Sequence, residues 1–586
     1  MLPTGIFGFY SADGEELRRA EGELRARCGE GEGLIARMSA DGRLLLGCVI
    51  STTYSYPATL TESGDGGAIG VFDGMLYEES ALATQPARLA DMSESDIAAA
   101  ANGMFLAAAY RYGRLRLLSD PFATLPLYYA GQSGRFGFST SLHILRWWHA
   151  LRAPLRRDET GYAQYLAFGK VFGSGTTTAG VRRMQAAEIL DIDCGKDCAA
   201  WRERKYYEPD VRPAEYPGVE DDMVAAFRQA VGTLTEASRG ASISALTGGL
   251  DSRAIAAVLH ADRPDATVVT HFTQEGNDIA VARAVAAKLR VTHVTEQLPA
   301  KHALAAERED FLAAGNGITP LNNIHASEVH RRYARHGSLL LDGNNTWIEA
   351  RLFMRNTAHR VKDKASLLRE VAALQLRYGV LDYVRDAERH RRRAMEALEA
   401  LLPDPADFTD AACAADTVYV RHILPVHVTD LAGMQNRFIR YVSPYFDRRY
   451  VDLVARMHPK RRWRQEPQNR IVAACAPQLR GMARSYADVL SWPTDHPWLL
   501  RAPVAFERAY DRIGLARRWP ALHAALSRRR YSVACDILLP DGEAAFDIDD
   551  DIFDAPRIRR ALAEAGPRLR DPGLIRLLQY ILPGRM

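Results

Sequence analysis

Cysteine is scarce in this sequence, and the spacing of the cysteines excludes two kinds of scaffold. The 586 residues include 7 cysteines, and no two of them form a CxxC pair. An odd number of scattered cysteines argues against a disulfide framework, and the lack of CxxC pairs argues against a structural zinc site. This usage fits a reducing compartment, and we expect a cytoplasmic protein.

Signals for a membrane are also missing. The N-terminus, MLPTGIFGFYSADG, has no basic region and reaches the acidic Asp13 too early for a secretory signal peptide. No uninterrupted apolar run is long enough to span a bilayer. We therefore expect no membrane span.

The chain lacks an excess of one charge sign. Its formal net charge is +3, which is too close to balance to indicate a nucleic-acid partner. Local runs of arginine occur at 391–393 and 528–530. We interpret them as solvated helix faces, with a docking patch for an acidic peptide as the alternative.

Tandem repeats are absent as well. The length of the chain is therefore the guide to the number of domains. With 47% hydrophobic and 25% charged residues the composition is that of a globular protein. A chain this long exceeds what one hydrophobic core usually serves, so we expect at least two large domains. The predicted divisions are a domain over residues 1–205, a second over 206–500 and a helical C-terminal extension over 501–586.

The first two predicted domains differ in their patterns. Residues 1–205 read as a β-rich α+β domain with turns between short apolar segments. Its expected strands are 5–10, 43–50, 125–129 and 135–140, and its expected helices are 13–27 and 95–104. From residue 219 strands and helices alternate, which predicts a parallel, doubly wound sheet followed by a large helical portion. The expected elements there are helix 219–238, strand 241–246, helix 253–260, strand 267–272, helix 279–289 and strands 291–294 and 338–341.

The most informative segment is LTGGLDSR, residues 246–253, between a predicted strand and a predicted helix. Two glycines allow a tight turn and a close approach to a ligand, and the N-terminus of the helix favours phosphate. Thr247 and Ser252 add hydroxyl donors, and Asp251 can hold Mg²⁺. Because GK[ST] is absent, this is not a Walker loop. The alternative is an ordinary strand–turn–helix connection.

Four segments of the chain carry a resemblance to one family. The TGGLDS string resembles the pyrophosphatase loop (PP-loop) of ATP-dependent synthetases. SDPFATLPLYY (119–129) and FGFSTS (136–141) resemble stretches of the class II glutaminase domain of asparagine synthetases, and SPYFDRRYVD (443–452) resembles their PFLDxxLV signature. These matches follow the order of the family, so the chain is identified as a member of the glutamine-hydrolysing asparagine synthetase family.

The resemblance implies a fold and a chemistry. The fold would be an Ntn-type glutaminase-like α+β sandwich followed by an α/β PP-loop domain of the adenine nucleotide alpha hydrolase type. ATP, with Mg²⁺, would activate a carboxylate as an adenylate with release of pyrophosphate, and an amine would displace AMP. Asp251 and Asp342 would hold the metal, and Asp251 would act in catalysis. The implied nucleotide-binding residues are Leu246, Thr247, Gly248, Gly249, Asp251, Ser252, Asp342 and Gly343.

The glutaminase part departs from the family pattern. The family's nucleophile is a Cys directly after the initiator Met, whereas this chain has Leu2. FDGMLY (72–77) stands where the family has the NGExYN glutamine clamp, so Asp73 and Met75 replace its Asn and Glu. We therefore predict that glutamine hydrolysis is lost, and that the nitrogen comes from a free amine.

The synthetase part departs as well. Where the family has SGxGxDE, this chain has DGNNTWIE (342–349), so Trp347 takes the position of the second Mg²⁺ aspartate. Asp342 or Glu349 could supply that carboxylate, or the ligand is lost. The family's active-site Lys has no counterpart near 476–485. Arg484 stands there and could stabilise pyrophosphate or an oxyanion, but guanidinium does not act as a base.

Family members without the glutaminase Cys include lasso-peptide macrolactam synthetases and β-lactam synthetases, which close a ring with the substrate's own amine. The resemblance thus implies a lasso-peptide cyclase. It would adenylate an Asp or Glu side chain of a precursor peptide and join it to the peptide's N-terminal amine, working beside a leader peptidase and a leader-recognition protein. The alternatives are a small-molecule synthetase, for ammonia-dependent asparagine formation or β-lactam closure, and an inactive member that binds a peptide partner.

Overall fold

The structure is a computed structural model. It describes residues 4–482, 533–534, 551–565 and 568–569. Within the first of these ranges the gaps are 30–31, 52–57, 151–154, 196–197, 239, 264, 273–276, 300–306, 308–310, 313, 317–318, 320–323, 345–359, 376–379, 409 and 464.

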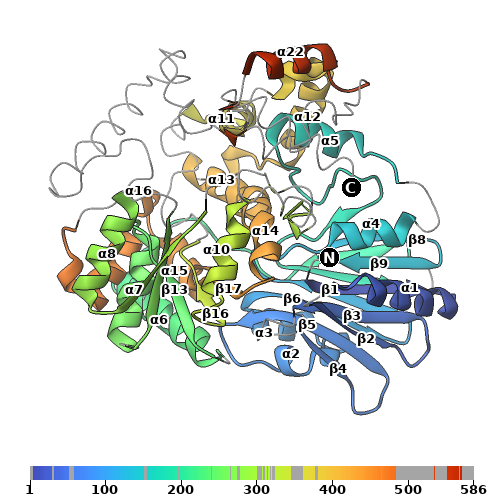
Figure 1. Cartoon of the computed structure of the whole chain (residues 1–586), viewed down its shortest axis with the longest axis horizontal. Helices are drawn as coiled ribbons and strands as arrows, with labels where there is room; N and C mark the ends of the chain where they lie inside the picture. The colour runs from blue at the N-terminus through green and yellow to red at the C-terminus, as the bar shows by residue number, and fades with distance from the viewer. Residues whose placement is uncertain are drawn as a thin grey trace.

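Two antiparallel sheets pack face to face over residues 5–205, which we name the N-terminal sandwich (Figure 1). The first sheet has the order β10 (Arg182–Arg183), β8 (Tyr128–Gln132), β9 (Arg135–Ser139), β1 (Gly5–Ser11), β3 (Leu44–Ser51) and β2 (Glu32–Met38). The second has the order β12 (Trp201–Lys205), β11 (Glu188–Asp193), β7 (Arg114–Ser119), β6 (Gly103–Arg111), β5 (Ala68–Leu76) and β4 (Thr59–Glu62). The observed α+β sandwich is the class of fold predicted for this region.

Successive side chains of β1 alternate between the inner and the outer face of the first sheet. Ile6 and Tyr10 point into the core between the two sheets, and Phe7 and Phe9 point to the outer face. There they pack against α1 (Gly14–Arg27) and α4 (Leu142–Ala150). The outer face of the second sheet is covered by α2 (Ala81–Thr84), η1 (Pro86–Ala90) and α3 (Glu94–Ala100). The connection to the next sheet includes α5 (Glu159–Phe168).

The third sheet is parallel throughout. Its order is β15 (Thr292–Gln297), β14 (Thr267–Phe272), β13 (Ser242–Ala245), β16 (Leu339–Leu341) and β17 (Arg440–Val442). The chain winds outward from β13 in one direction and then returns to the other side of it through β16. In open α/β sheets, ligands bind beyond the carboxyl ends of the strands where the winding direction changes. Here that place lies between the loops that follow β13 and β16.

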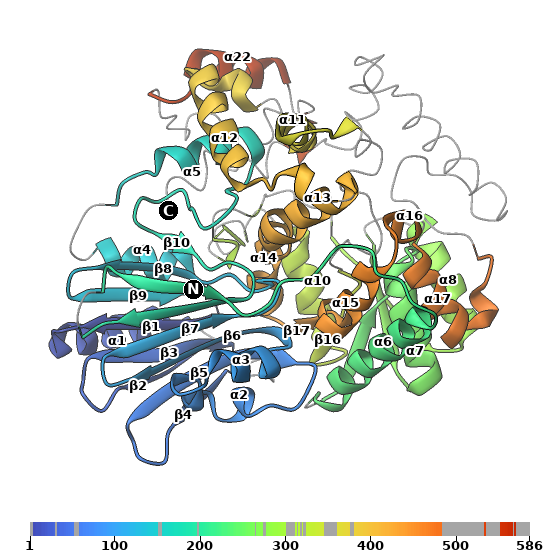
Figure 2. The same ribbon diagram turned by 180° about the vertical axis from the view of Figure 1, so that it is seen from behind.

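Helices surround this sheet and form a separate layer above it in Figures 1 and 2. Around the sheet are α6 (Val219–Glu236), α7 (Asp251–Asp262), α8 (Asn277–Leu289), α10 (His325–Tyr333), α14 (Leu424–Gln435), α15 (Arg448–Arg456), α16 (Pro459–Trp463) and α17 (Glu466–Cys475). The helical layer holds α11 (Lys364–Gln375), η5 (Val380–Tyr383), α12 (Ala387–Leu401), α13 (Ala411–Val418) and α22 (Ala555–Ala565). The remaining short elements are η6 (Pro405–Asp407), η7 (Tyr419–Ile423), η8 (Pro444–Phe446), η9 (Pro477–Leu479), β18 (Val533–Ala534) and β19 (Arg568–Leu569).

The described part of the C-terminal region docks on the helical layer. Val384 forms an isolated bridge with Phe553, and the Arg385 N–H donates to the carbonyl of Ile552 at 2.6 Å. Phe553 is 2% exposed and belongs to the main core. Of the extension predicted over 501–586, the described part contains helix α22 and strands β18 and β19, which pair as a short two-stranded sheet. In the ranges that the structure covers, no helix combines the length and apolarity that crossing a bilayer requires.

Most predicted elements occur where the pattern placed them, with two exceptions. The expected helix over 95–104 ends at Ala100, because Gly103 already belongs to β6 and pairs with Leu76 of β5. The expected strand over 125–129 begins only at Tyr128. Pro126 has no N–H to give to a sheet ladder, which explains the late start. The domain boundaries at 205/206 and 500/501 stay predictions.

Candidate active site

The loops after β13 and β16 meet beyond the carboxyl ends of their strands. Gly343, in the loop after β16, lies directly against the start of α7. A Cβ atom on Gly343 would be 2.8 Å from the Ser252 amide nitrogen and 3.2 Å from the Asp251 Cβ. A side chain on residue 343 would clash at these distances, so the close approach requires glycine. The predicted PP-loop residues and the predicted Asp342-Gly343 pair therefore lie next to each other in the structure.

The hydroxyl groups of the PP-loop hold its turn through hydrogen bonds within the loop. The Thr247 amide donates to the Ser252 Oγ at 3.0 Å, and the Gly249 amide donates to the Thr247 Oγ1 at 3.1 Å. The two hydroxyl oxygens are 3.0 Å apart. Leu246, whose side chain is buried, directly follows the end of β13 at Ala245. The hydroxyls that the sequence predicted as phosphate donors thus also hold the loop in a turned form.

Two charged side chains hold the main chain of Gly248. The Asp278 Oδ1, at the start of α8, accepts the Gly248 N–H at 2.8 Å. The Arg253 Nη2 donates to the Gly248 carbonyl at 3.2 Å, and Arg253 is 2% exposed. Neither residue was predicted as a site residue. For Asp278 the only signal was an acidic residue at the start of a predicted helix after the strand next to β13.

Asp251 is held from two other elements. The Gln468 Nε2, from α17, donates to the Asp251 Oδ1 at 3.0 Å, and the Tyr445 hydroxyl donates to the Asp251 main-chain oxygen at 2.9 Å. Gln468 and Tyr445 are both fully buried. The carboxylate therefore has a fixed orientation at the N-terminus of α7, where the helix dipole favours negative charge. Sequence reasoning missed both partners.

The surroundings of Asp251 fit the way in which proteins usually bind Mg²⁺. Over the residues covered by the structure, no group of three or more His, Cys, Asp or Glu side chains is arranged as a metal cage. Mg²⁺ is commonly bound by one or two carboxylates together with the phosphates of the substrate, and it keeps several waters. Asp251 beside the PP-loop suits that arrangement.

Asp342 lies in a poorly solvated part of the site. Its amide donates to the Val442 carbonyl at 3.0 Å, which ties the loop to β17. Burial raises the pKa of the Asp342 carboxyl, while the Tyr441 hydroxyl and the Gly343 amide lower it in part. Burial, with Asp342 as the next cause, also raises the pKa of Tyr441 and of Tyr333. Asp342 thus loses its proton less readily than an exposed aspartate, although a bound cation would favour its ionised form.

Three predicted residues cannot be placed. Glu349, Arg484 and Trp347 lie outside the described residues. Their roles stay predictions.

An ion pair lies in the segment 72–77, which by sequence aligns with the family's glutamine clamp. Asp73 Oδ1 lies 2.7 Å from the Nη2 of Arg440, which belongs to β17 of the parallel sheet. The Arg440 side chain is 3% exposed and that of Asp73 is 15% exposed. Both residues line a cavity beside Thr4, Thr140 and Asn436. The predicted replacement of a neutral clamp residue by Asp73 is thus matched by a cationic partner from the other half of the molecule.

Comparison with known proteins places the site within a recognised segment. Residues 223–344 match the family model described as asparagine synthase. This segment runs from α6 to the loop after β16, so it contains both loops of the site. The carboxyethyl-arginine beta-lactam-synthase of Streptomyces clavuligerus is 28% identical over 207 residues, which are 35% of this chain and 37% of that protein. The match thus spans little more than a third of the relative's length.

Two solved structures are also similar in part. An NH3-dependent NAD synthetase from Campylobacter jejuni has 12% sequence identity and a TM-score of 0.19, and the match covers 32% of this chain and 98% of that one. A glutamine phosphoribosylpyrophosphate amidotransferase from B. subtilis has 11% identity and a TM-score of 0.21, over 59% of this chain and 83% of that one. TM-scores this low support no argument.

Proposed function

We propose that this protein uses ATP and Mg²⁺ to activate a carboxylate and join it to an amine, with release of pyrophosphate and AMP. One observation carries the proposal: a TGGLDS loop stands at the switch point of a parallel sheet and is closed against Gly343, within the segment that matches asparagine synthase. The N-terminus of α7 lies at this place, and the N-terminus of a helix favours a phosphate group.

The residues have distinct roles in this proposal. The loop 247–249 and the N-terminus of α7 bind the pyrophosphate part of ATP. Mg²⁺, held by Asp251 and the phosphates, would neutralise the charge that develops on the leaving pyrophosphate. A carboxylate oxygen of the substrate attacks the α-phosphorus and the bond to pyrophosphate breaks. The amine nitrogen then attacks the activated carbonyl carbon, the bond to AMP breaks, and the amine gives up its proton.

For the substrate we propose a peptide, as in a lasso-peptide cyclase that forms a macrolactam from an Asp or Glu side chain and the N-terminal amine. One feature supports an amine supplied by the substrate itself: the side chain of Asp73 is engaged by Arg440 where the family binds glutamine. A leader peptidase and a leader-recognition protein would be the partners, in the cytoplasm.

A second candidate is a small-molecule synthetase. The relative from Streptomyces clavuligerus is named a β-lactam synthase, and its similarity supports this candidate as well as it supports the first. Ammonia-dependent asparagine formation belongs to the same class.

The deciding experiment measures pyrophosphate and AMP release from Mg·ATP, with and without a trimmed precursor peptide encoded beside this protein. Peptide-dependent release, together with loss of one water from the peptide mass, would establish the cyclase. Release with aspartate and ammonia, or with a β-amino acid substrate, would establish the small-molecule synthetase. No release with any of these would overturn the ligase proposal.

Asp251→Ala is the residue-level test of the same proposal. We expect it to abolish pyrophosphate release while circular dichroism shows an intact fold, because Asp251 is half-exposed at a helix terminus and not in a core. Turnover retained in Asp251→Ala would remove the PP-loop assignment.

A further inference from the structure

One short segment touches both the N-terminal sandwich and the PP-loop. This bridging segment, residues 440–449, comprises β17, η8 and the start of α15. It begins with the edge strand of the parallel sheet, and it lies where that sheet faces the sandwich in Figure 2. Its residues are almost all buried.

The side of the bridging segment that faces the sandwich is held by hydrogen bonds. The Tyr77 hydroxyl donates to the Ser443 carbonyl at 2.5 Å, and the Ser443 amide donates to the Met104 sulfur at 3.2 Å. The Asn102 Nδ2 donates to the Asp447 Oδ1 at 2.9 Å. These bonds join residues 339 to 366 positions apart in the sequence, so tertiary packing alone makes them.

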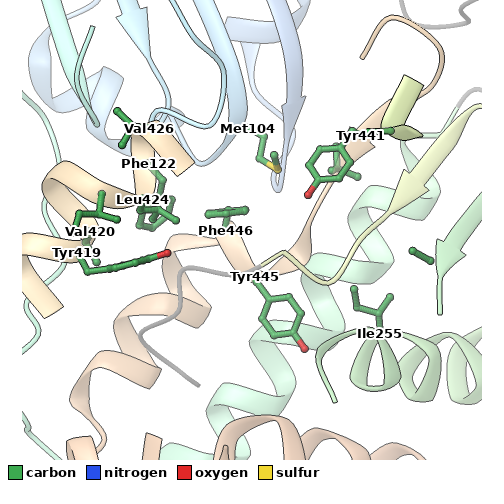
Figure 3. Close-up of a cluster of buried hydrophobic side chains, with 14 of the residues drawn as sticks. Met104, Phe122, Ile255, Tyr419, Val420, Leu424, Val426, Tyr441, Tyr445 and Phe446 are labelled. Atoms are coloured by element: carbon green, nitrogen blue, oxygen red, sulfur yellow. The ribbon is translucent and has the colours of Figure 1, made fainter. Parts of the chain in front are cut away.

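The other side of the same segment reaches the site. Tyr445, two residues after Ser443, donates its hydroxyl to the Asp251 main-chain oxygen at 2.9 Å. Its ring packs 4.7 Å from that of Phe227. In Figure 3 the Phe446 side chain points toward Met104, whereas Tyr445 points toward the helix that carries Ile255, which is α7. Neighbouring side chains thus alternate between the sandwich and the PP-loop.

We propose that the N-terminal sandwich serves as a positioning element for the synthetase site, with Tyr77 and Tyr445 as positioning residues that act through Ser443 on Asp251. The inference rests on the proposed ligase function and assigns the sandwich a role in it. Close-packed interiors transmit displacements because few voids exist to absorb them. A shift of the Ser443 carbonyl therefore moves Tyr445, and Tyr445 moves the first residue of α7.

The test uses single-atom changes in the full-length protein. Tyr77→Phe and Tyr445→Phe each remove one hydroxyl and keep the ring. Tyr206→Phe is the matched control, since the Tyr206 hydroxyl also donates to a main-chain oxygen, that of Ser119 at 2.7 Å, but within the sandwich. The readouts are kcat and KM for pyrophosphate release, the melting temperature, and hydrogen–deuterium exchange of the peptide covering residues 246–254.

We expect Tyr77→Phe and Tyr445→Phe to lower kcat roughly tenfold, below the ~100-fold that a 1 Å misplacement can cost. The double variant should be no slower than the worse single variant, because both act on one chain of contacts. Both variants should exchange faster at 246–254. Tyr206→Phe should lower the melting temperature by a similar amount while kcat and that exchange rate stay unchanged.

The inference is overturned if Tyr77→Phe matches Tyr206→Phe in every readout, because the hydroxyl then supplies stability only. It is also overturned if the two kcat effects multiply in the double variant. The exchange measurement needs no turnover. If the wild-type protein releases no pyrophosphate, the ligase proposal fails, while faster exchange at 246–254 in Tyr77→Phe would still support the positioning contact and unchanged exchange would reject it.

Discussion

At the scale of single residues, neighbouring side chains hold the functional groups of the site. The carboxylate of Asp251 accepts a hydrogen bond from Gln468, and Gly248 is held by Asp278 and Arg253. Preorganised groups of this kind stabilise a transition state without reorganisation at the moment of reaction. Substituting the partners should therefore change activity more than stability.

Gln468→Ala tests whether losing the hydrogen bond to Asp251 changes activity more than stability. Losing the Nε2 donor frees the carboxylate to rotate, so we expect kcat for pyrophosphate release to fall by about tenfold or more, with a smaller change in KM. Steady-state kinetics with Mg·ATP measures it. Gln478→Ala is the control, because Gln478 is exposed on η9 and contacts His260. Equal kinetics for the two variants would show that Gln468 does not orient Asp251.

A buried carboxyl in the sandwich predicts a pH effect on stability. Burial raises the pKa of Glu188 from 4.5 to about 7, and the Gln185 amide, which donates to Glu188 Oε2 at 2.7 Å, lowers it in part. An acid whose folded pKa is raised binds more protons when folded, so its contribution to the free energy of unfolding falls as pH rises through that window.

Glu188→Gln removes this titration. Relative to wild type, the variant should gain stability between pH 4.5 and 7, by on the order of 1–3 kcal/mol. Urea unfolding at several pH values measures the difference. Glu15→Gln, on the exposed face of α1, is the control because water solvates that carboxyl in the folded and unfolded chains. A wild-type–variant difference that is flat with pH would contradict the prediction.

At the scale of elements, the site depends on the approach of one loop to one helix. The loop after β16 lies against the N-terminus of α7, and the Asp342 amide ties that loop to β17. Strand β13 and helix α7 position the PP-loop, and strands β16 and β17 position the loop that contains Asp342 and Gly343. The geometry of the nucleotide site is therefore set by the parallel pairing of β13, β16 and β17.

Gly343→Ala should disturb this approach. Its Cβ would meet backbone at 2.8 Å, so the loop must shift, and we expect Mg·ATP to bind at least tenfold more weakly by calorimetry. Gly232→Ala is the matched control: it lies inside α6 with open space around the added Cβ, and it should raise the free energy of unfolding by about 0.5–1 kcal/mol. Unchanged ATP affinity in Gly343→Ala would argue against a nucleotide between these loops.

At the scale of the whole molecule, the sandwich and the parallel sheet are joined by buried polar contacts as well as by core packing. The Asp73–Arg440 ion pair links β5 to β17, and Arg437 lies 3.5 Å from Glu32 of β2. Breaking a buried ion pair is costly, because one charge stays in a poorly solvated place. These pairs should couple the unfolding of the two halves.

Asp73→Ala tests that coupling. We expect a loss of about 3–5 kcal/mol in the free energy of unfolding. The double variant Asp73→Leu/Arg440→Met should recover most of it, because both charges are then gone. Calorimetry should show one transition in wild type and a separate early transition in Asp73→Ala. Asp210→Ala, which breaks an exposed pair with Arg212, is the control and should change the melting temperature little.

The sequence by itself determined the features that depend on near neighbours. Hydrophobic periodicity predicted β14 over 267–272 and the start of α6 at Val219, and the TGGLDS string predicted the loop at residues 247–252. Periodicity failed at 95–104, because pairing with β5 brings Gly103 into a strand. Local signals succeed where the contacts that stabilise an element lie within a few residues of it.

Only the tertiary structure decided which side chains orient the site. The hydrogen bonds to Gly248 and Asp251 come from residues 30, 194 and 217 positions away, which are Asp278, Tyr445 and Gln468. In the sequence Asp278 stands beside a predicted helix and Tyr445 lies in the segment 443–452, but no local pattern indicates that these side chains, or that of Gln468, reach the site. The contacts arise because parallel strands bring their carboxyl ends to one edge of a sheet, so loops that are distant along the chain meet there.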